Sequence, residues 1–350
     1  MHPLELVTKL RTFLPPEAVL YESEDLKPYE CDGLSAYRQT PMIVALPQTE
    51  DEVVRILRIC HASKIPVVAR GAGTGLSGGA LPHATGVLLS LAKLKRILEV
   101  DPIARTARVQ PGVRNLAISE AAAPYGLYYA PDPSSQIACS IGGNVAENSG
   151  GVHCLKYGLT VHNILQLRVI TMAGESLEIG GASLDAPGYD LLALMTGSEG
   201  MLGIVTEIMV KLTPSPEKAQ VVMAAFDDIR KAGNAVANVI GAGIIPAGLE
   251  MMDRPMTRAV EEFIDDLLRR EPKALQFNAN ETNVVVHTHC HAKSLTGGAY
   301  LHRLAMRLPE RQVTMLNSGC CGMAGAFGAL ESKYELSTAV AKTLIDQVRR

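Results

Sequence analysis

The sequence predicts a mixed fold of α-helices and β-strands that is organised around three glycine-rich segments. Residues 49–64 have the apolar spacing of an amphipathic helix, whereas residues 65–70 are a short apolar run that is typical of a buried strand. Glycine clusters at 71–79, 142–151 and 197–203 each lie beside such a run. We therefore expect the glycine segments to connect strands and helices, as turns or as ligand-binding loops.

The composition restricts the class of protein. A chain of 350 residues is long enough for two or three domains. Its net charge of −3 argues against a nucleic-acid partner, and the absence of tryptophan argues against stacking on single-stranded bases. Seven cysteines, an odd number, fit reduced thiols or metal ligands better than a disulfide framework.

No segment of the sequence has the features of a membrane anchor or a leader. Residues 1–14 are amphipathic and lack the apolar centre of a signal peptide. The most apolar run, residues 237–252, is too short for a transmembrane helix and is interrupted by Gly243 and Pro246. We expect a cytoplasmic protein without a transmembrane segment, which could still meet a membrane through a partner.

The first glycine segment contains the nucleotide fingerprint G-x-G-x-x-G at residues 73–78. In a Rossmann fold this fingerprint follows a strand and opens directly into a helix. A capping box formed by Thr49 and Glu52 does begin a helix before the strand at 65–70. After the loop, however, come further strand-like runs at 86–91, 97–101 and 106–112, so we exclude the Rossmann turn.

Two interpretations of this first loop stay open. It is either a plain turn or a nest of consecutive backbone N–H groups around a phosphate. The second segment, residues 131–151, adds neutral hydrogen-bonding side chains at Ser134, Ser135, Asn144 and Asn148. The third, residues 197–212, places three glycines before an alternating strand. Singly each is explained by a tight turn or close packing, but together they favour a ligand site.

Five motifs together resemble the FAD domain of the vanillyl-alcohol oxidase type, and within it the glycolate oxidase catalytic subunit and its D-lactate dehydrogenase relatives. The resemblance extends to about Asp265 and implies an α+β fold in which FAD lies extended between two subdomains. The motifs are PQTEDEVVRIL (47–57), PVVARGAGTGLSGGA (66–80), ARVQPGV (107–113), PDPSSQIACSIGGNVAENSGG (131–151) and GSEGMLGIVTEIMVKL (197–212).

The resemblance implies a set of cofactor-binding residues. Backbone donors of the first loop would wrap the FAD diphosphate, in Arg70, Gly71, Ala72, Gly73, Thr74, Gly75, Leu76 and Ser77. Near the flavin and its ribityl chain would lie Pro131, Asp132 and Ser135. Along the cofactor would lie Cys139, Gly142, Gly143, Asn148 and Gly151. The adenine and ribose side would be supported by Glu199, Gly203, Ile204 and Val205.

Three further residues bear on how the cofactor is held. Some relatives attach the flavin to a histidine in the glycine loop, and this loop has none, so we expect non-covalent FAD. We interpret His83 and His153 as surface or polar-core residues. Cys139 is either a reactive thiol or a small packing residue, and the absence of a neighbouring cation in the sequence favours packing.

The predicted domain organisation has four parts. They are an N-terminal arm (1–37), an FAD-binding domain (38–215), a partial α+β cap that would carry substrate (216–266) and a small α/β cysteine-rich module (267–350). The linker TPSPEK (213–218), a strand-like run at 219–226 and a helix from Asp228 to about Gly241 mark the cap, and they are followed by a strand end and another helix within residues 247–268. Its usual glycine-, asparagine- and histidine-bearing metal motif is not found, so we expect a truncated cap.

The tail resembles the cysteine-rich domain of iron–sulfur oxidoreductase subunits, which is named for its Cys-Cys-Gly motif. The resemblance rests on residues 283–295 and 316–328. It offers Cys290, Cys320 and Cys321 as ligands of an iron–sulfur cluster, since thiolates are soft ligands. The alternative is a module whose thiols carry no metal.

The function predicted from this resemblance is oxidation of a small 2-hydroxyacid, of the D-lactate or glycolate class. The hydride would pass from C2 to flavin N5, and the electrons to an acceptor other than a nicotinamide, such as an iron–sulfur or electron-transfer subunit. The sequence identifies no catalytic residue. The first rival is an FAD-binding subunit or remnant without independent turnover. The second is a flavoprotein that reduces enolpyruvyl groups.

Overall fold

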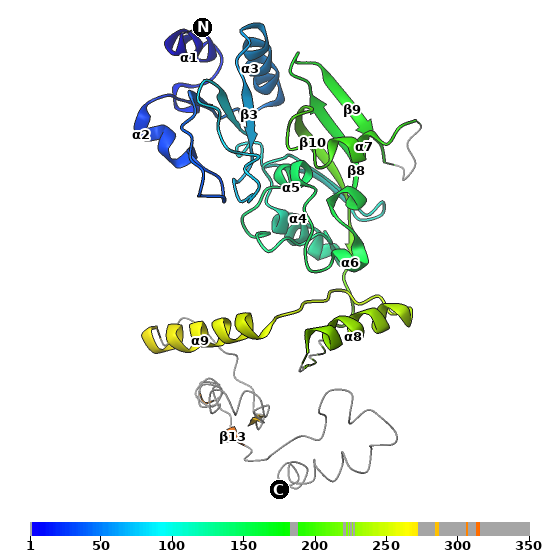
Figure 1. The fold of residues 1–350 in the computed structure, drawn as a ribbon. Helices are drawn as coiled ribbons and strands as arrows, with labels where there is room; N and C mark the ends of the chain where they lie inside the picture. The colour runs from blue at the N-terminus through cyan, green and yellow to red at the C-terminus, as the bar shows by residue number, and fades with distance from the viewer. Residues whose placement is uncertain are drawn as a thin grey trace, which may run out of the picture. The chain divides into compact units, whose positions relative to one another are not determined.

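The computed structural model describes residues 2–182, 188–219, 222, 224, 226, 228–271, 284–286, 306 and 313–315. The chain divides into two compact units. Unit 1 comprises residues 1–220 with 245–249, and unit 2 comprises residues 221–244 with 250–350. Unit 1 contains two larger sheets, of four and five strands, with helices packed around them (Figure 1). It holds all three glycine segments.

The first sheet of unit 1 has four strands in the order β1-β2-β4-β3. β1 pairs antiparallel with β2, whereas the β2–β4 and β4–β3 pairs are parallel. A parallel connection needs a crossover, and helix α3 supplies it between β2 and β3. The strands are β1 (Val19–Leu20), β2 (Ile43–Ala45), β3 (Val67–Arg70) and β4 (Val87–Ser90).

Helix α3 (Glu50–Ala62) begins at the predicted capping box. The Thr49 hydroxyl accepts a hydrogen bond from the backbone N–H of Glu52 at 3.2 Å, and the Glu52 carboxylate accepts from the N–H of Thr49 at 3.2 Å. The apolar face of the helix is buried in the first core, at Val53, Ile56, Leu57 and Cys60. Both the helix and its start were therefore predicted correctly.

Strand β3 corrects one expectation. The apolar run at 65–70 predicts a buried strand, yet every residue of β3 is half-buried. The reason is topological, because β3 is an edge strand that pairs only with β4. Its end, Arg70, leads directly into the first glycine loop. The edge position leaves one side of the loop open to form a pocket.

The second sheet of unit 1 has five antiparallel strands in the order β5-β6-β10-β8-β9. Its central strand alternates buried and half-buried residues, as the sequence predicts. Helices α4 (Asn115–Ala122) and α5 (Ile141–Glu147) share the core of this sheet. The strands are β5 (Ile97–Asp101), β6 (Thr106–Val109), β8 (Ile164–Ile170), β9 (Ser176–Gly180) and β10 (Ile204–Lys211).

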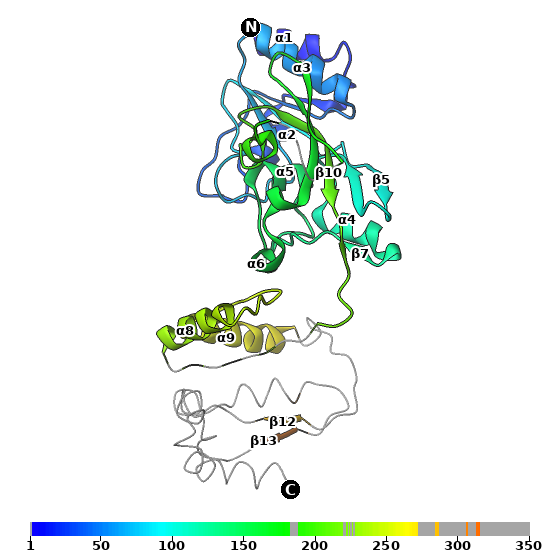
Figure 2. The same cartoon turned by 90° about the vertical axis from the view of Figure 1, so that its right-hand side faces the viewer.

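Shorter elements complete unit 1, as the two views show (Figures 1 and 2). β7 (Leu127–Tyr128) pairs with β11 (Thr213–Pro214). Four further helices are α1 (Pro3–Leu10), α2 (Ser23–Leu26), α6 (Cys154–Tyr157) and α7 (Leu191–Met195). The 3₁₀ turns are η1 (Pro16–Ala18), η2 (Lys27–Tyr29), η3 (Ala123–Tyr125) and η4 (Thr160–Asn163).

Unit 2 contains two predicted helices, each begun by an aspartate side chain. Asp228 caps α8 (Ile229–Gly241), and Asp253 caps α9 (Arg254–Arg270). Strands β12 (Val284–Val286) and β13 (Val313–Met315) pair in parallel. Of the strand predicted at 219–226, four residues lie outside the described part of the chain, and the described residues 219, 222, 224 and 226 are not in a strand.

Candidate FAD site

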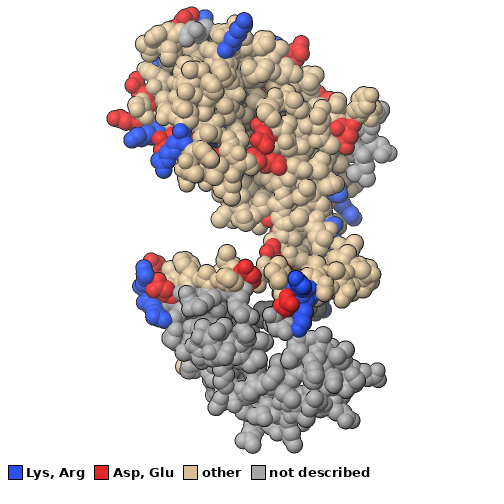
Figure 3. All heavy atoms as spheres, viewed as in Figure 1, with Lys and Arg blue, Asp and Glu red and all other residues tan. Residues whose placement is uncertain are grey.

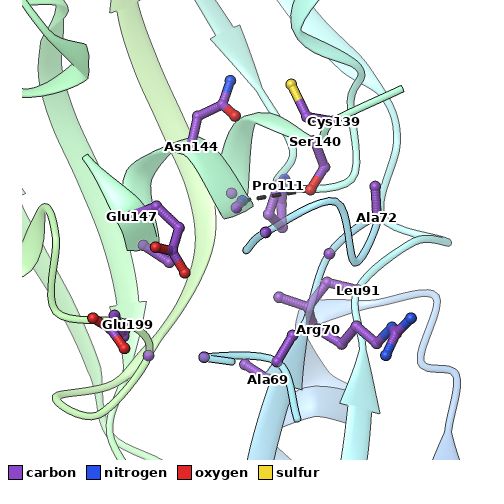
Figure 4. Close-up of a pocket in the computed structure, with 18 of the residues that line it drawn as sticks. Ala69, Arg70, Ala72, Leu91, Pro111, Cys139, Ser140, Asn144, Glu147 and Glu199 are labelled. Atoms are coloured by element: carbon purple, nitrogen blue, oxygen red, sulfur yellow. Dashed lines mark hydrogen bonds between the residues drawn. The ribbon is translucent and has the colours of Figure 1, made fainter. Parts of the chain in front are cut away.

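The three glycine segments of unit 1 meet around one pocket, which has a volume of about 300 Å³. The pocket lies between the loop that follows β3 and the start of helix α5 and strand β10 (Figure 4). Many of the residues that the sequence assigned to the cofactor line it. They are Arg70, Gly71, Ala72, Gly73, Thr74, Gly75, Leu76, Ser135, Cys139, Gly142, Gly143, Glu199, Gly203, Ile204 and Val205.

Five assigned residues are not among those that line this pocket: Ser77, Pro131, Asp132, Asn148 and Gly151. Three of them have other partners. The Ser77 hydroxyl donates to Glu147 at 3.3 Å, and the Asn148 side chain accepts from the backbone N–H of Val161 at 3.1 Å. Asp132 is bonded to His153. Their contact with a cofactor stays a prediction.

Other residues line the pocket that the sequence did not assign to the cofactor. They are Asp32, Ala69, Gly79, Ala80, Leu91, Pro111, Ser140, Asn144, Ala146, Glu147, Ser149, Met195, Ser198 and Gly200. A helix-start signal at Ser140 was available, because serine is a preferred N-cap. Asn144 was recognised as a neutral hydrogen-bonding residue and Pro111 stands in the motif at 107–113, but no local pattern marks Asp32.

A side chain would be strained at two glycines of the pocket. Gly73 has a φ of +70°, and a Cβ there would meet the Arg70 guanidinium, with Cζ at 2.8 Å and Nε at 2.9 Å. At Gly142 a Cβ would lie 2.5 Å from the Cβ of Pro111 and 3.0 Å from its carbonyl oxygen. Substitution of Gly73 would therefore strain the loop, and substitution of Gly142 would force the start of the helix away from Pro111.

Arg70 anchors the first glycine loop to the segment that contains Tyr29 and Cys31. Its guanidinium donates to the carbonyl oxygen of Cys31 at 2.7 Å and lies over the Tyr29 ring at 5.7 Å from the centroid. Burial lowers the pKa of this guanidinium, and the nearby charge of Asp32 opposes that shift. In Figure 4 the guanidinium points away from Glu147 and Glu199. Arg70 therefore holds the loop in place with its side chain.

Helix α5 presents polar groups to the pocket. The Ser140 hydroxyl caps the helix by accepting from the backbone N–H of Gly143 at 3.4 Å. Asn144 is 3% exposed, and its side-chain NH₂ has no hydrogen-bond partner in the described part of the chain. A buried donor without a partner costs about 1–3 kcal/mol. A ligand acceptor at this position would recover that energy.

Two carboxylates, Glu147 and Glu199, lie on the same side of the pocket (Figure 4). A Cβ on Gly79 would be 3.0 Å from Glu147 Oε1 and 3.3 Å from Glu199 Oε2. Burial, and then the charges of Glu199 and Asp32, raise the pKa of Glu147. Carboxylates are acceptors for hydroxyl and amine donors, so this side suits a sugar better than a phosphate.

Asp132 and His153 form a pair next to the second glycine segment. His153 Nδ1 lies 2.7 Å from Asp132 Oδ2, and the His153 backbone N–H donates to Asp132 Oδ1 at 3.2 Å. The imidazole is 42% exposed and faces Tyr157 at 6.4 Å between ring centroids. His153 is thus a surface residue, as expected, and Asp132 fixes its ring orientation.

Helix α3 fastens the two sheets that border the pocket. Its Glu50 carboxylate accepts from the Thr206 hydroxyl of β10 at 2.7 Å and lies 3.9 Å from Arg168 of β8. At the other end of the helix, Arg58 donates to the carbonyl oxygen of Gly174 at 3.0 Å. The spacing between the two sides of the pocket is therefore fixed by bonds outside it.

This chemistry suits a dinucleotide with a diphosphate. In the loop after β3, the backbone N–H groups of residues 72–77 donate no hydrogen bond to other described residues. Consecutive free N–H groups of this kind can bind phosphate. The unpartnered NH₂ of Asn144 adds a neutral donor, and the acidic side of the pocket adds acceptors for hydroxyl groups. The small residues between them let an extended ligand lie against the backbone. The residues present therefore fit FAD.

Comparison with known proteins agrees with this geometry. Residues 41–180 match the family model of the FAD binding domain, and residues 215–294 match that of the C-terminal domain of FAD linked oxidases. The fold is the FAD-binding fold of the vanillyl-alcohol oxidase type. The predictions of this fold class and of FAD as the cofactor are confirmed.

The curated proteins to which the chain is similar include glycolate oxidase subunits. The chain is 63% identical over 255 residues to the glycolate oxidase subunit GlcD of Escherichia coli (strain K12). The aligned region covers 73% of this chain and 51% of that protein. It is 42% identical over 248 residues to the subunit GlcD of Bacillus subtilis (strain 168), over 71% of this chain and 53% of that protein. The chain thus spans about half the length of the curated relatives it matches.

Among solved structures, an alkyldihydroxyacetonephosphate synthase has the same fold. Its TM-score is 0.61 at 22% identity, over 71% of this chain and 47% of that chain. At this identity the likeness concerns the fold alone. It agrees with the two-sheet architecture of unit 1.

Two further expectations concern other parts of the chain. Cys290, Cys320 and Cys321, the predicted metal ligands, lie outside the described residues. Within the part that the structure describes, none of the helices has the length and apolar character needed to cross a bilayer. On the face drawn in Figure 3, acidic and basic side chains are mixed, and the described basic residues form no continuous surface for nucleic acid.

Proposed function

We propose that this chain is the FAD-dependent part of an oxidoreductase that acts on small 2-hydroxyacids of the glycolate or D-lactate class. The observation that carries the proposal is the pocket in which three glycine segments converge. The glycolate oxidase subunits to which the chain is similar support the substrate class. When bound, FAD supplies the acceptor for the hydride that leaves C2 of the substrate.

The residues of the chain have distinct parts in this function. Backbone N–H groups of residues 71–77 hold the diphosphate, and Arg70 keeps this loop in place through Cys31. Asn144 donates a hydrogen bond to the cofactor from a site that excludes water. Cys139, which is 4% exposed, packs against the cofactor as a small apolar residue. No general base is assigned to any residue.

The cofactor is held without a covalent bond in this proposal, because the loop at 70–79 contains no histidine. Denaturing the FAD-loaded protein should release all of the flavin into the supernatant. Flavin that precipitates with the protein would contradict this mode of binding.

The proposal also divides the chain into four parts and assigns a route for the electrons. We place the N-terminal arm at 1–37, the FAD-binding domain at 38–215, a partial cap at 216–266 and the cysteine-rich module at 267–350. The match to FAD linked oxidases continues to residue 294, past the proposed end of the cap. Electrons would leave for an iron–sulfur or other electron-transfer subunit, directly or through a cluster at Cys290, Cys320 and Cys321. A cytoplasmic location stays part of the proposal.

An anaerobic titration tests the function. FAD-loaded protein is mixed with glycolate, D-lactate or D-2-hydroxyglutarate without oxygen, and the visible flavin absorbance is followed. The proposal predicts that at least one of the first two substrates bleaches the flavin. If dithionite bleaches the flavin and no 2-hydroxyacid does, the alternative holds, namely an FAD-binding subunit or remnant that has no turnover by itself.

A further inference from the structure

A short segment of the N-terminal arm, residues 29–34, lies directly against the first glycine loop. A Cβ on Gly33 would be 2.7 Å from the carbonyl oxygen of Gly75 and 2.9 Å from that of Thr74. From the loop, Arg70 donates to the carbonyl oxygen of Cys31 at 2.7 Å. The contact is therefore close, and the charged guanidinium of Arg70 stabilises it. Residues 29–34 precede the region at 41–180 that matches the FAD binding domain.

Within this segment Asp32 has an unusual environment. The residue is 7% exposed and lines the pocket. Its Oδ1 accepts a hydrogen bond from the backbone N–H of Leu34 at 2.9 Å, whereas its Oδ2 is buried and has no hydrogen-bond partner in the described part of the chain. Burial of a carboxylate oxygen is costly unless it is hydrogen-bonded, so this oxygen calls for a donor.

No donor for this oxygen lies within the described part of the chain. Arg70 is the cation whose charge acts on Asp32, but its guanidinium donates to the carbonyl oxygens of Cys31 and Tyr29. The neighbouring side chains across the pocket include Glu147, which is also an acceptor. A donor from a ligand would complete the site.

We propose that Asp32 is a cofactor-contacting residue, whose free carboxylate oxygen accepts a hydrogen bond from a sugar hydroxyl of FAD. The inference rests on the FAD site proposed above. Phosphate oxygens are acceptors and would be repelled, whereas the ribityl chain and the adenosine ribose both carry hydroxyl donors. The N-terminal arm is thereby part of the cofactor site, and it completes a pocket that the matched domain forms only in part.

The test compares two substitutions of the same kind. Asp32→Asn keeps the acceptor for the Leu34 N–H and replaces the free oxygen by an NH₂ group, which cannot accept a hydrogen bond. The matched control is Asp101→Asn, because Asp101 Oδ1 accepts from Ile103 N–H at 2.8 Å in the same type of turn, and Asp101 does not line the pocket. FAD is removed from the full-length proteins and titrated back while flavin fluorescence is recorded.

The expected result is a roughly 10- to 150-fold higher Kd for FAD in Asp32→Asn, which is the range for loss of a hydrogen bond to a charged group. Asp101→Asn should bind FAD like wild type. The melting temperature of cofactor-free Asp32→Asn should stay within about 4 °C of wild type. Asp32→Ala, measured in the same way, should lose at least as much affinity.

Binding of two smaller ligands, ADP and FMN, shows which part of FAD carries the hydroxyl that Asp32 contacts. If ADP binding weakens as much as FAD binding in Asp32→Asn, the donor is on the adenosine ribose. If FMN binding weakens and ADP binding does not, the donor is on the ribityl chain. Either result supports the proposal.

An FAD Kd within twofold of wild type in both Asp32 variants would overturn the inference and leave the proposed function intact. The inference would also fail if Asp101→Asn lost affinity equally, because the effect would then be general. Absence of FAD binding in the wild type would instead overturn the proposed function itself.

Discussion

The Gly73→Ala substitution tests how the glycine loop is built. Gly73 has a φ of +70°, and an alanine in this left-handed region costs about 1–2 kcal/mol. The new methyl group would also meet the Arg70 guanidinium and displace it from the carbonyl oxygen of Cys31, which lies 2.7 Å away. Loss of that charged hydrogen bond adds about 1.5–3 kcal/mol. The expected loss in unfolding free energy is therefore about 2.5–5 kcal/mol.

Gly126→Ala is the matched control for this substitution. Gly126 has a φ of +67°, and a Cβ there has no atom within 4 Å. Urea denaturation of the cofactor-free proteins should show a loss of only about 1–2 kcal/mol for the control. FAD affinity should fall in Gly73→Ala and stay unchanged in Gly126→Ala. Equal losses of stability in both variants would refute the argument that Arg70 occupies the space at Gly73.

Three further predictions concern the surroundings of the site. Thr49→Ala removes the cap of α3 and should lower the unfolding free energy by about 0.5–2 kcal/mol in urea denaturation, and no loss would contradict the capping box. Burial raises the pKa of Cys60 to about 12, so at pH 8 a thiol reagent followed by peptide mapping should label half-buried Cys31 and leave Cys60 unmodified in the folded protein. Rapid labelling of native Cys60 would argue against its burial. Burial raises the pKa of Glu147 above its ordinary 4.5, so the folded state binds the extra proton and loses stability as the pH rises through that pKa. Relative to wild type, Glu147→Gln should therefore become more stable as the pH rises above 4.5, and urea midpoints that change with pH in the same way for both proteins would contradict the shift.

The features that the sequence predicted correctly are those with local causes. The capping box at Thr49 and the alternation along β10 each depend on residues a few positions apart. The glycine segments were recognised as parts of one site because their motifs resemble a known family. Their convergence around one pocket then follows from the fold.

The features that the sequence could not predict depend on distant contacts. β3 is half-exposed because it is a sheet edge, which no property of residues 67–70 reveals. Asp32 reaches the pocket because Arg70, 38 positions later, holds the arm against the loop. A Cβ on Gly73 would meet the guanidinium of Arg70, a contact that the sequence alone did not reveal. In each case the missing information was which segments pack together.

The central claim is that the pocket between the two sheets of unit 1 binds FAD. The most direct test is an FAD titration of the cofactor-free wild type beside Gly143→Leu and Gly233→Leu. A Cβ on Gly143 meets only Ser140 Oγ, at 3.3 Å, so leucine would extend into the pocket. Gly233 lies on the exposed surface of α8 with no atom within 4 Å of a Cβ. Leucine favours both helices over glycine, so both variants should fold. The account predicts one FAD per chain in wild type and in Gly233→Leu and none in Gly143→Leu, whereas wild-type binding by a folded Gly143→Leu would contradict it.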